Sequence, residues 1–357
     1  MTRVLLIAEA GVNHNGDPEL ALRLVDAAAD AGADVVKFQT FRAEALAAVA
    51  APTAGYQAAA GEGASQLAML RRLELSQAAH RAVVARCRER GIAFLSSPFD
   101  AESLAFLVDG LGLGRIKLGS GELTNGPLLL AAARSGRPVI LSTGMGDLAE
   151  VAEALGVLAH GYAGRGTPSG RGDFAAALAD PAARALLAEK VVLLHCTTQY
   201  PAPVDQANLA AMATMRHAFG VPVGYSDHTP GTAVAIAAAA LGAVAIEKHF
   251  TLDRSLPGPD HAASLEPGEL AAMIADIRAV ERAIGDGVKQ AQPAELANVA
   301  VARKSLVAAR PIAAGEVIGP DAIVAKRVGG GLSPMEHWRL IGSVAGRAYA
   351  ADEPIEG

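Results

Sequence analysis

Residues 17–39 are DPELALRLVDAAADAGADVVKFQ, a stretch that predicts one helix followed by one buried strand. Asp17 precedes Pro18, which is typical of a helix start because proline fits the first helical position and lacks the amide hydrogen that would be unpaired there. Gly32 is a stop signal, and the run Val35–Gln39 is typical of a parallel strand that is covered on both faces.

The same alternation of strand and helix continues on both sides of this stretch. The predicted strands are Val4–Ala8, Val35–Gln39, Ala93–Ser97, Arg115–Leu118, Val139–Ser142, Val191–His195, Val221–Tyr225 and Val244–Lys248. Eight strand-then-helix units that end near Gly287 predict a (β/α)₈ TIM barrel, an α/β fold of about 250 residues.

Two connections of this barrel are long. Phe41–Ser65 follows the second strand and is rich in Ala and Gly, so we expect an active-site flap there. His160–Glu189 precedes the sixth strand and indicates a surface insertion with one helix, Phe174–Leu187.

After Gly287 the pattern changes to short strand-like pieces separated by Pro and Gly. Gln290–Asn298 is typical of a linker. The predicted strands beyond it are Ser305–Ala308, Glu316–Ile318 and Ile323–Lys326. The chain is therefore divided into a catalytic barrel at 1–287, a linker at 288–300 and a small β-rich domain at 301–357.

Composition excludes several classes of protein. Hydrophobic residues make up 51% and charged residues 19% of the 357 residues, which excludes a disordered chain. Two cysteines exclude a disulfide scaffold and a cysteine-rich zinc module. A net charge of −6 and 4% aromatic residues argue against nucleic-acid partners.

Neither a membrane span nor a secretory signal is expected. The longest apolar stretch, Thr232–Ile246, has 15 residues and contains Gly242, whereas a spanning helix needs about 20. The N-terminal apolar run ends within a few residues, at Glu9. We therefore expect a cytoplasmic protein with no membrane partner.

Polar side chains follow every predicted strand of the barrel. Active sites of this fold lie at the carboxyl ends of the strands, so these groups should meet in one cavity. They are Glu9, Asn13, His14, Lys37, Gln39, Ser96, Ser97, Lys117, Ser120, Glu122, Ser142, Thr143, His195, Thr197, Thr198, Tyr200, Ser226, Asp227, His228, Glu247 and His249.

Lys37 and Lys117 lie near the ends of otherwise apolar strands. Each lysine could simply pair with a nearby carboxylate. The alternative is anion binding, which the hydroxyls of Ser120, Ser142 and Ser226 beside glycines favour, because glycine lets backbone N–H groups approach a phosphate or carboxylate. The combination predicts a substrate with several negative charges.

His228 and His249 end adjacent strands, so both imidazoles could bind one divalent metal. Two histidines would leave coordination positions open for water and substrate, as a Lewis-acid site requires. His195 and His14 are weaker candidates, and Cys196 has the features of a small core residue.

Glu9 and Glu122 are candidate acid–base groups or ligands of substrate hydroxyls. The alternative for each is an ion pair with a lysine.

Several motifs along the barrel are specific. They are IAEAGVNHNG (7–16), VKFQTF (36–41), IKLGSGE (116–122), LSTGM (141–145), HCTTQYP (195–201), GYSDHT (224–229), IEKHFT (246–251) and GPDHAASLEP (258–267). In this order they resemble the sialic acid synthase family, which condenses phosphoenolpyruvate with amino sugars. The C-terminal segment resembles the family's SAF domain, which is similar to type III antifreeze protein.

The resemblance implies roles for individual residues. Phosphoenolpyruvate would be bound by Lys37, Lys117, Ser120, Ser142, Thr198 and Ser226, although Thr198 stands where some members carry Asn. The sugar would be bound by Glu9, Gln39, Ser97, Tyr200, Asp260 and Arg327. His228 and His249 would bind Mn²⁺, with Mg²⁺ or Co²⁺ as alternatives, and Glu122 and Glu9 would be catalytic. Arg327 would reach the partner subunit's site, which implies a domain-swapped homodimer.

The resemblance implies condensation of an N-acetylmannosamine-type sugar to N-acetylneuraminate and phosphate. The alternative within the family is a 2,4-diacetamido-trideoxyhexose, which gives N,N'-diacetyllegionaminate or pseudaminate. Outside the family, a metal-dependent aldolase or hydrolase would explain the histidines but not the lysines and serines. A non-catalytic ice- or ligand-binding role is the other alternative, although the charged Lys326 and Arg327 do not suit a flat apolar ice-binding face.

Overall fold

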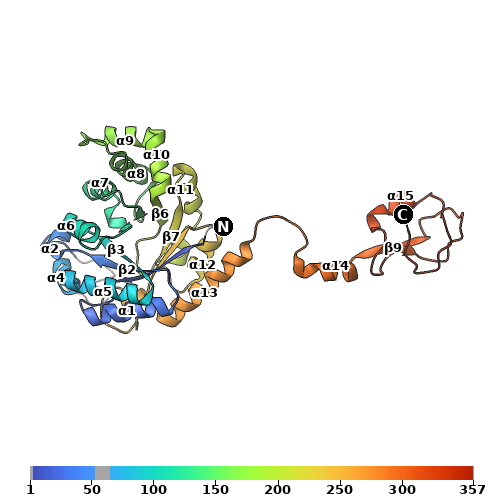
Figure 1. Cartoon of the computed structure of the whole chain (residues 1–357), viewed down its shortest axis with the longest axis horizontal. Coiled ribbons are helices and arrows are strands. Elements are labelled where there is room, and N and C mark those ends of the chain that lie inside the picture. Colours follow the sequence, from blue (N-terminus) through green and yellow to red (C-terminus); the bar gives the residue numbers. More distant parts are fainter. Residues whose placement is uncertain (1–2, 53–64, 357) are drawn as a thin grey trace. The chain divides into compact units, whose positions relative to one another are not determined.

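A computed structural model describes residues 3–52 and 65–356 of the chain. The chain divides into two compact units, Met1–Asp286 and Gly287–Gly357, each with its own core. Each unit is described separately below (Figure 1).

Within the described residues, one sheet of eight parallel strands forms the centre of the first unit, and helices surround it (Figure 1). The order of the strands is β3-β2-β1-β8-β7-β6-β5-β4, and the end strands β3 and β4 contact each other, so the sheet nearly closes. The predicted TIM barrel is thereby confirmed. The strands are β1 (Leu5–Gly11), β2 (Val35–Thr40), β3 (Ala93–Pro98), β4 (Ile116–Leu118), β5 (Val139–Ser142), β6 (Val191–His195), β7 (Val223–Asp227) and β8 (Ala245–His249).

The interior of the barrel is built in layers because side chains alternate along each strand. Ile7, Val35 and Ala245 belong to a buried apolar cluster at the lower level. Two residues further along β1 and β2 come Glu9 and Lys37, which pair across the two strands. The strand period therefore places the charged groups directly above an apolar layer of the barrel interior.

Helices cover the outer face of the sheet and enclose the larger hydrophobic core. Asp17 caps the first helix by accepting from the amide of Glu19, as the sequence predicts. The helices are α1 (Pro18–Asp30), α2 (Ala43–Leu46), α4 (Gln66–Leu73), α5 (Gln77–Arg90), α6 (Ala101–Ala105), α7 (Gly126–Arg134), α8 (Leu148–Tyr162), α9 (Arg171–Ala179), α10 (Pro181–Lys190), α11 (Ala211–Phe219), α12 (Ala233–Ala240) and α13 (Pro267–Ile284).

The insertion before β6 contains two helices, α9 and α10, which pack against α8. The prediction of a single helix over Phe174–Leu187 is wrong. Asp180 has extended backbone and accepts from the amide of Ala182, so it ends one helix and caps the next, with Pro181 at the first position. Part of the other long connection, the predicted flap Phe41–Ser65, lies outside the described residues, at 53–64.

The C-terminal unit has its own small core around the antiparallel pair β9 (Lys304–Ala308) and β10 (Ile323–Arg327). The predicted strand Glu316–Ile318 is wrong, since it is reduced to an isolated bridge between Val317 and Val344. Helices α14 (Leu296–Ala302) and α15 (His337–Leu340) complete the unit, and α14 makes the predicted linker partly helical.

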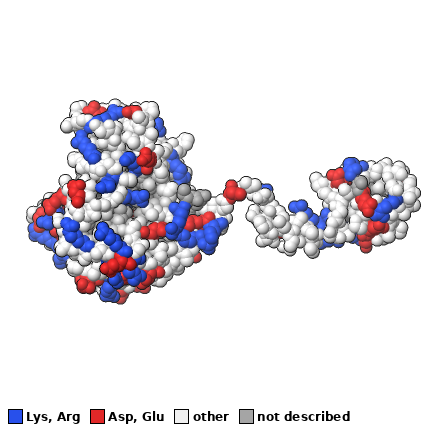
Figure 2. Space-filling view, in the orientation of Figure 1, with Lys and Arg blue, Asp and Glu red and all other residues white. Residues whose placement is uncertain are grey.

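Two further observations concern the surface. Acidic and basic side chains are interspersed over the barrel unit on the face that Figure 2 shows. In residues 3–52 and 65–356, no helix combines the length and the apolar composition that a membrane span needs.

Candidate active site

A cavity of about 800 Å³ lies at the carboxyl ends of the barrel strands. Seven of the polar strand-end residues that the sequence predicts for this cavity do not line it: Asn13, His14, Ser96, Thr143, His195, Thr197 and Asp227. The cavity does bring together every barrel residue to which the resemblance assigns a role. They are Glu9, Lys37, Gln39, Ser97, Lys117, Ser120, Glu122, Ser142, Thr198, Tyr200, Ser226, His228, His249 and Asp260. Arg327 lies on β10 of the C-terminal unit, where its Nε donates to the carbonyl of Ala302 at 3.1 Å.

Four buried charges form the floor of the cavity. Lys37 Nζ lies 2.7 Å from Glu9 Oε1 and 3.1 Å from Glu247 Oε2. Lys117 Nζ lies 3.4 Å from Glu247 Oε1. Two positive and two negative groups thus compensate one another, as burial of charge requires.

The two lysines differ electrostatically. Burial opposes the charge of Lys37, but Glu247 and Glu9 outweigh it, so the pKa of Lys37 is raised. Burial also opposes the charge of Lys117, and there it prevails over Glu247, so the pKa of Lys117 is lowered. Burial disfavours the Glu9 carboxylate, yet His249, Lys37 and Lys117 hold its pKa below the usual range. Glu9 is therefore an ionised carboxylate of the site.

Glu247 joins these groups, and the sequence predicts it among the polar strand ends that meet in the cavity without assigning it a role. Its carboxylate contacts both lysines and accepts a hydrogen bond of 2.9 Å from Ser226 Oγ. The signal for it was the two-residue period of β8, which places Glu247 on the same face as His249.

The strands β4 to β7 supply hydroxyl and amide groups suited to a phosphate. Lys117 Nζ donates to Ser142 Oγ at 2.8 Å, and the amide of Gly144 donates to Ser120 Oγ at 3.0 Å. The buried Thr198 Oγ1 has no hydrogen-bond partner among the described residues. A Cβ on Gly144 would lie 2.2 Å from that oxygen, so only glycine fits there.

The imidazoles of His228 and His249 face each other at the mouth of the barrel, with ring centroids 5.6 Å apart. His228 Nδ1 donates to the carbonyl of Thr197 at 2.7 Å, which leaves Nε2 free to bind a metal. Burial, with a smaller contribution from His249, lowers the pKa of His228 to about 4, so its ring is neutral at pH 7.

The two imidazoles fit a metal site in which the protein supplies only some of the ligands. His249 Nδ1 is buried and has no hydrogen-bond partner in residues 3–52 and 65–356, and His249 Nε2 lies 3.4 Å from Glu9 Oε2. No group of three or more His, Cys, Asp or Glu side chains suited to a metal occurs in the part of the chain that the structure describes. The protein therefore offers two imidazoles, and the remaining positions would be left to water or substrate.

Glu122 lies apart from the lysines, in the short 3₁₀ turn Ser120–Glu122 after β4. Its Oε2 accepts a hydrogen bond of 2.6 Å from Asn125 Nδ2. Burial raises the pKa of Glu122, and Asp100 adds to the effect, whereas Asn125 opposes it. The surroundings thus shift the pKa of Glu122 upward and the pKa of Glu9 downward. Opposite shifts are typical of two carboxylates with different acid–base roles.

The side chains predicted for the sugar gather mainly on β2, β3 and the loops after β6 and β8. Ser97 Oγ accepts from Lys37 Nζ at 3.5 Å, and Tyr200 packs on His228 with ring centroids 4.2 Å apart. Asp260 Oδ2 lies 4.0 Å from His249 Nδ1, and burial raises the pKa of Asp260.

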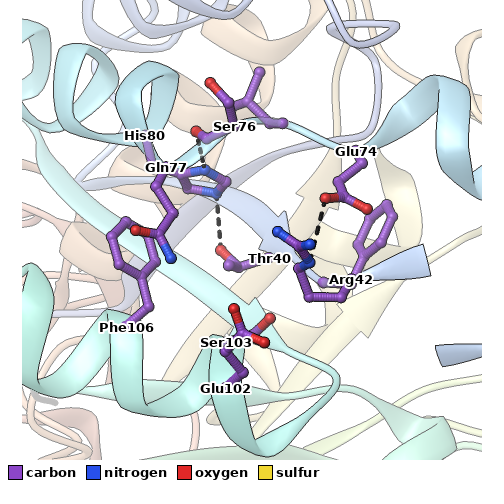
Figure 3. Close-up of a pocket in the computed structure, with 11 residues that line it drawn as sticks. Thr40, Arg42, Glu74, Ser76, Gln77, His80, Glu102, Ser103 and Phe106 are labelled. Atoms are coloured by element: carbon purple, nitrogen blue, oxygen red, sulfur yellow. Dashed lines mark hydrogen bonds and ion pairs between the residues drawn. The ribbon is translucent and has the colours of Figure 1, made fainter. Parts of the chain in front are cut away.

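A second, much smaller cavity lies on the outer side of β2 (Figure 3). At about 30 Å³ it is too small for a sugar. Figure 3 shows His80 directed at Thr40, at 2.8 Å, and Thr40 Oγ1 also lies 2.7 Å from Ser96 Oγ. These contacts hold the ends of β2 and β3 together, directly behind Gln39 and Ser97.

The weaker candidates from the sequence, His195, His14 and Cys196, have surroundings that suit a structural role. His195 Nε2 donates to the carbonyl of Ala207 at 2.9 Å, and burial lowers the pKa of His195. His14 is fully buried, and its Nδ1 accepts from the amide of Gly16. Burial raises the pKa of Cys196, which opposes a nucleophilic role.

Comparisons with known proteins agree with this geometry. The chain matches the NeuB family over residues 24–289 and the SAF domain over residues 303–357. It is 44% identical to the N,N'-diacetyllegionaminic acid synthase of Campylobacter jejuni, with 99% of each chain covered. It is 42% identical to the Legionella pneumophila synthase of the same name, with 95% of this chain and 89% of the relative covered.

A solved structure agrees as well. The N-acetylneuraminic acid synthetase of Leptospira borgpetersenii, crystallised with citrate, superimposes with a TM-score of 0.67 at 32% identity, covering 84% of this chain and 90% of the other. The predicted resemblance is confirmed, including the enzymatic, bond-forming class to which these synthases belong. The chain belongs to the NeuB family and carries a C-terminal SAF domain.

Proposed function

We propose that this protein condenses phosphoenolpyruvate with a 2,4-diacetamido-2,4,6-trideoxyhexose to give N,N'-diacetyllegionaminic acid and phosphate. The observation that supports the condensation is that Lys37, Lys117 and the hydroxyls of the phosphate side lie in one cavity with the two imidazoles. The similarity to two N,N'-diacetyllegionaminic acid synthases favours this sugar over N-acetylmannosamine, the first expectation from the sequence.

The reaction forms a bond between carbon 3 of phosphoenolpyruvate and the aldehyde carbon of the open-chain sugar. Water adds to carbon 2, and the tetrahedral intermediate then expels phosphate with its bridging oxygen. The oxygen of the water becomes the keto oxygen. One of its protons ends on the former aldehyde oxygen and the other on the phosphate, so atoms and charges balance.

Each part of the site has a task in this scheme. Lys117, Ser142, Ser120 and Thr198 would bind the phosphate, and Lys37 would offset the remaining negative charge. Glu122, with its raised pKa, would accept a proton from the attacking water. Glu9, held ionised, would accept hydrogen bonds from the sugar. Alignment of two substrates lowers the barrier by up to about 7–11 kcal/mol in favourable cases.

His228 and His249 would hold a divalent cation, Mn²⁺ in our proposal. When bound, the cation supplies Lewis acidity toward the aldehyde oxygen. The chain's own part is to orient both imidazoles, and the hydrogen bond from His228 to Thr197 contributes to this.

The test is a phosphate-release assay with phosphoenolpyruvate and a panel of purified amino sugars, with products identified by mass spectrometry. We expect release that requires both substrates, and a higher kcat/KM for the diacetamido sugar than for N-acetylmannosamine. Release without a sugar would support the aldolase or hydrolase alternative. Release only with N-acetylmannosamine would restore the first expectation.

A further inference from the structure

One wall of the active-site cavity is apolar. A hydrophobic cluster, separate from the barrel cores, lies around α2 and α4. Its members that line the cavity, here called the apolar wall, are Val12, Leu46, Met69, Leu70, Leu73 and Phe99.

Helix α4 presents a single face to the cavity. The residues of α4 that line the cavity are Gln66, Met69, Leu70 and Leu73. Their spacing of i, i+3, i+4 and i+7 is the spacing of one helix face. Met69, Leu70 and Leu73 are 2%, 8% and 4% exposed, so this face is packed and well defined.

The apolar wall is on the sugar side of the cavity. Five of its six residues follow β2 or β3, the two strands that carry Gln39 and Ser97, and Val12 follows β1. The phosphate-binding hydroxyls follow β4 to β7 instead. Of these strands, β4 contacts β3 where the sheet nearly closes, and the others are separated from β2 and β3 by further strands. A sugar beside Gln39 and Ser97 therefore has the apolar wall as its neighbour.

The two candidate sugars differ in the chemistry that such a wall recognises. N-acetylmannosamine carries one acetamido methyl group and has hydroxyls on carbons 4 and 6. The 2,4-diacetamido-2,4,6-trideoxyhexose carries two acetamido methyls and a methyl group at carbon 6. Hydroxyls placed against apolar side chains lose hydrogen bonds to water without replacement, whereas methyl groups gain by burial.

We propose that Met69, Leu70 and Leu73 of α4 are specificity-determining residues that select a deoxygenated, doubly N-acetylated sugar. This inference rests on the proposed function, because it assigns the sugar-binding role to a wall of the same cavity. One methyl or methylene group in an apolar pocket changes kcat/KM by about 10–200-fold, so the wall is sufficient to discriminate between the two sugars.

The experiment measures kcat/KM for both sugars in the full-length protein and takes their ratio as the readout. Met69→Gln keeps the length of the side chain and replaces the thioether by a polar amide. We expect the preference for the diacetamido sugar to fall about 10-fold or more, with the KM for phosphoenolpyruvate unchanged. Leu70→Ala, which removes apolar contact without adding polarity, should shift the ratio in the same direction and serves if Met69→Gln does not fold.

Leu67→Gln is the matched control. Leu67 lies on the same helix and in the same cluster, at 5% exposed, but does not line the cavity. Its substitution should lower stability without changing the ratio.

The outcomes separate the two proposals. Failure of the unsubstituted protein to use either sugar would contradict the proposed function, and a preference for N-acetylmannosamine would overturn the proposed sugar together with the wall. A wild-type preference for the diacetamido sugar that Met69→Gln and Leu70→Ala leave intact would overturn the wall alone.

Discussion

Asp227 and Lys248 form an ion pair of 2.8 Å whose side chains are at most 1% exposed, and each residue directly precedes one of the two cavity histidines. They pair across β7 and β8. Lys248 Nζ also donates to the carbonyl of Thr229, and Asp227 Oδ1 accepts from the Thr229 amide and hydroxyl. The pair lies on the opposite face of the strands from Glu247 and His249, so it joins the two strand ends from behind the site.

Lys248→Met should therefore destabilise the barrel strongly. The substitution leaves the Asp227 carboxylate buried without its cation, which costs about 3–5 kcal/mol. The free energy of unfolding is measured by denaturant titration, with a spectroscopic signal that reports on the barrel. The control is Arg171→Met, which removes an exposed ion pair of 3.5 Å with Glu153 and should cost under about 1 kcal/mol. Equal losses in the two variants would contradict the structural role of the pair.

Lys117→Met should weaken binding of phosphoenolpyruvate more than binding of the sugar. A hydrogen bond to a charged group contributes about 1.5–3 kcal/mol, which corresponds to a rise in KM of about 10–150-fold. Ser142→Ala, which removes the hydroxyl that Lys117 contacts, should give a smaller rise in the same constant. Steady-state kinetics with each substrate varied in turn gives the two KM values. An unchanged KM for phosphoenolpyruvate would exclude Lys117 from the phosphate site.

His249→Ala should abolish condensation and lower the affinity for Mn²⁺ while the fold is retained. Isothermal titration calorimetry with Mn²⁺ measures the metal affinity, and circular dichroism shows whether the fold is retained. The matched control is His195→Gln, since His195 also ends a barrel strand but bonds to the carbonyl of Ala207. An unchanged rate and metal affinity in His249→Ala would refute the metal role.

Glu122 should set the acidic limb of the pH profile. A group that must be ionised to accept a proton becomes active as pH rises through its pKa, and burial raises the pKa of Glu122. The acidic limb of kcat should therefore lie above the ordinary glutamate pKa of 4.5. Glu122→Gln should remove the limb and lower kcat by about 10²–10⁴-fold.

Asn125 provides an independent check of this assignment. Its amide favours the ionised form of Glu122, and its side-chain oxygen caps α7. Asn125→Ser can retain the cap but loses the amide donor, so the acidic limb should move to higher pH. A shift to lower pH would contradict Glu122 as the titrating group.

Arg327 tests the predicted domain-swapped homodimer. Arg327→Ala should raise the KM for the sugar more than that for phosphoenolpyruvate. Mixed dimers of Arg327→Ala and His249→Ala subunits should regain part of the activity, because one of their two sites would be intact. Equal effects on both substrates, or no recovery on mixing after subunit exchange, would contradict the prediction.

Local patterns were sufficient to predict the strands of the barrel and the residues that end them. Strand period and motif spacing placed Lys37, Lys117, His228 and His249 at the carboxyl ends, where the barrel topology makes them converge. The break at Asp180 was missed because Ala- and Leu-rich sequence on both sides has the same helical pattern, and Pro181 permits a new helix start as readily as a turn.

The amino-acid sequence by itself determined the barrel, the set of polar strand ends and the family, because alternation along a strand and the order of motifs are local properties of the chain. Tertiary structure alone decided that Glu247 joins both lysines, that Asp227 pairs with Lys248 and that one face of α4 lines the cavity. These contacts join residues that are about 20 to more than 200 positions apart in the sequence. Sheet register and packing decide which residues meet, and no short segment of sequence contains that information.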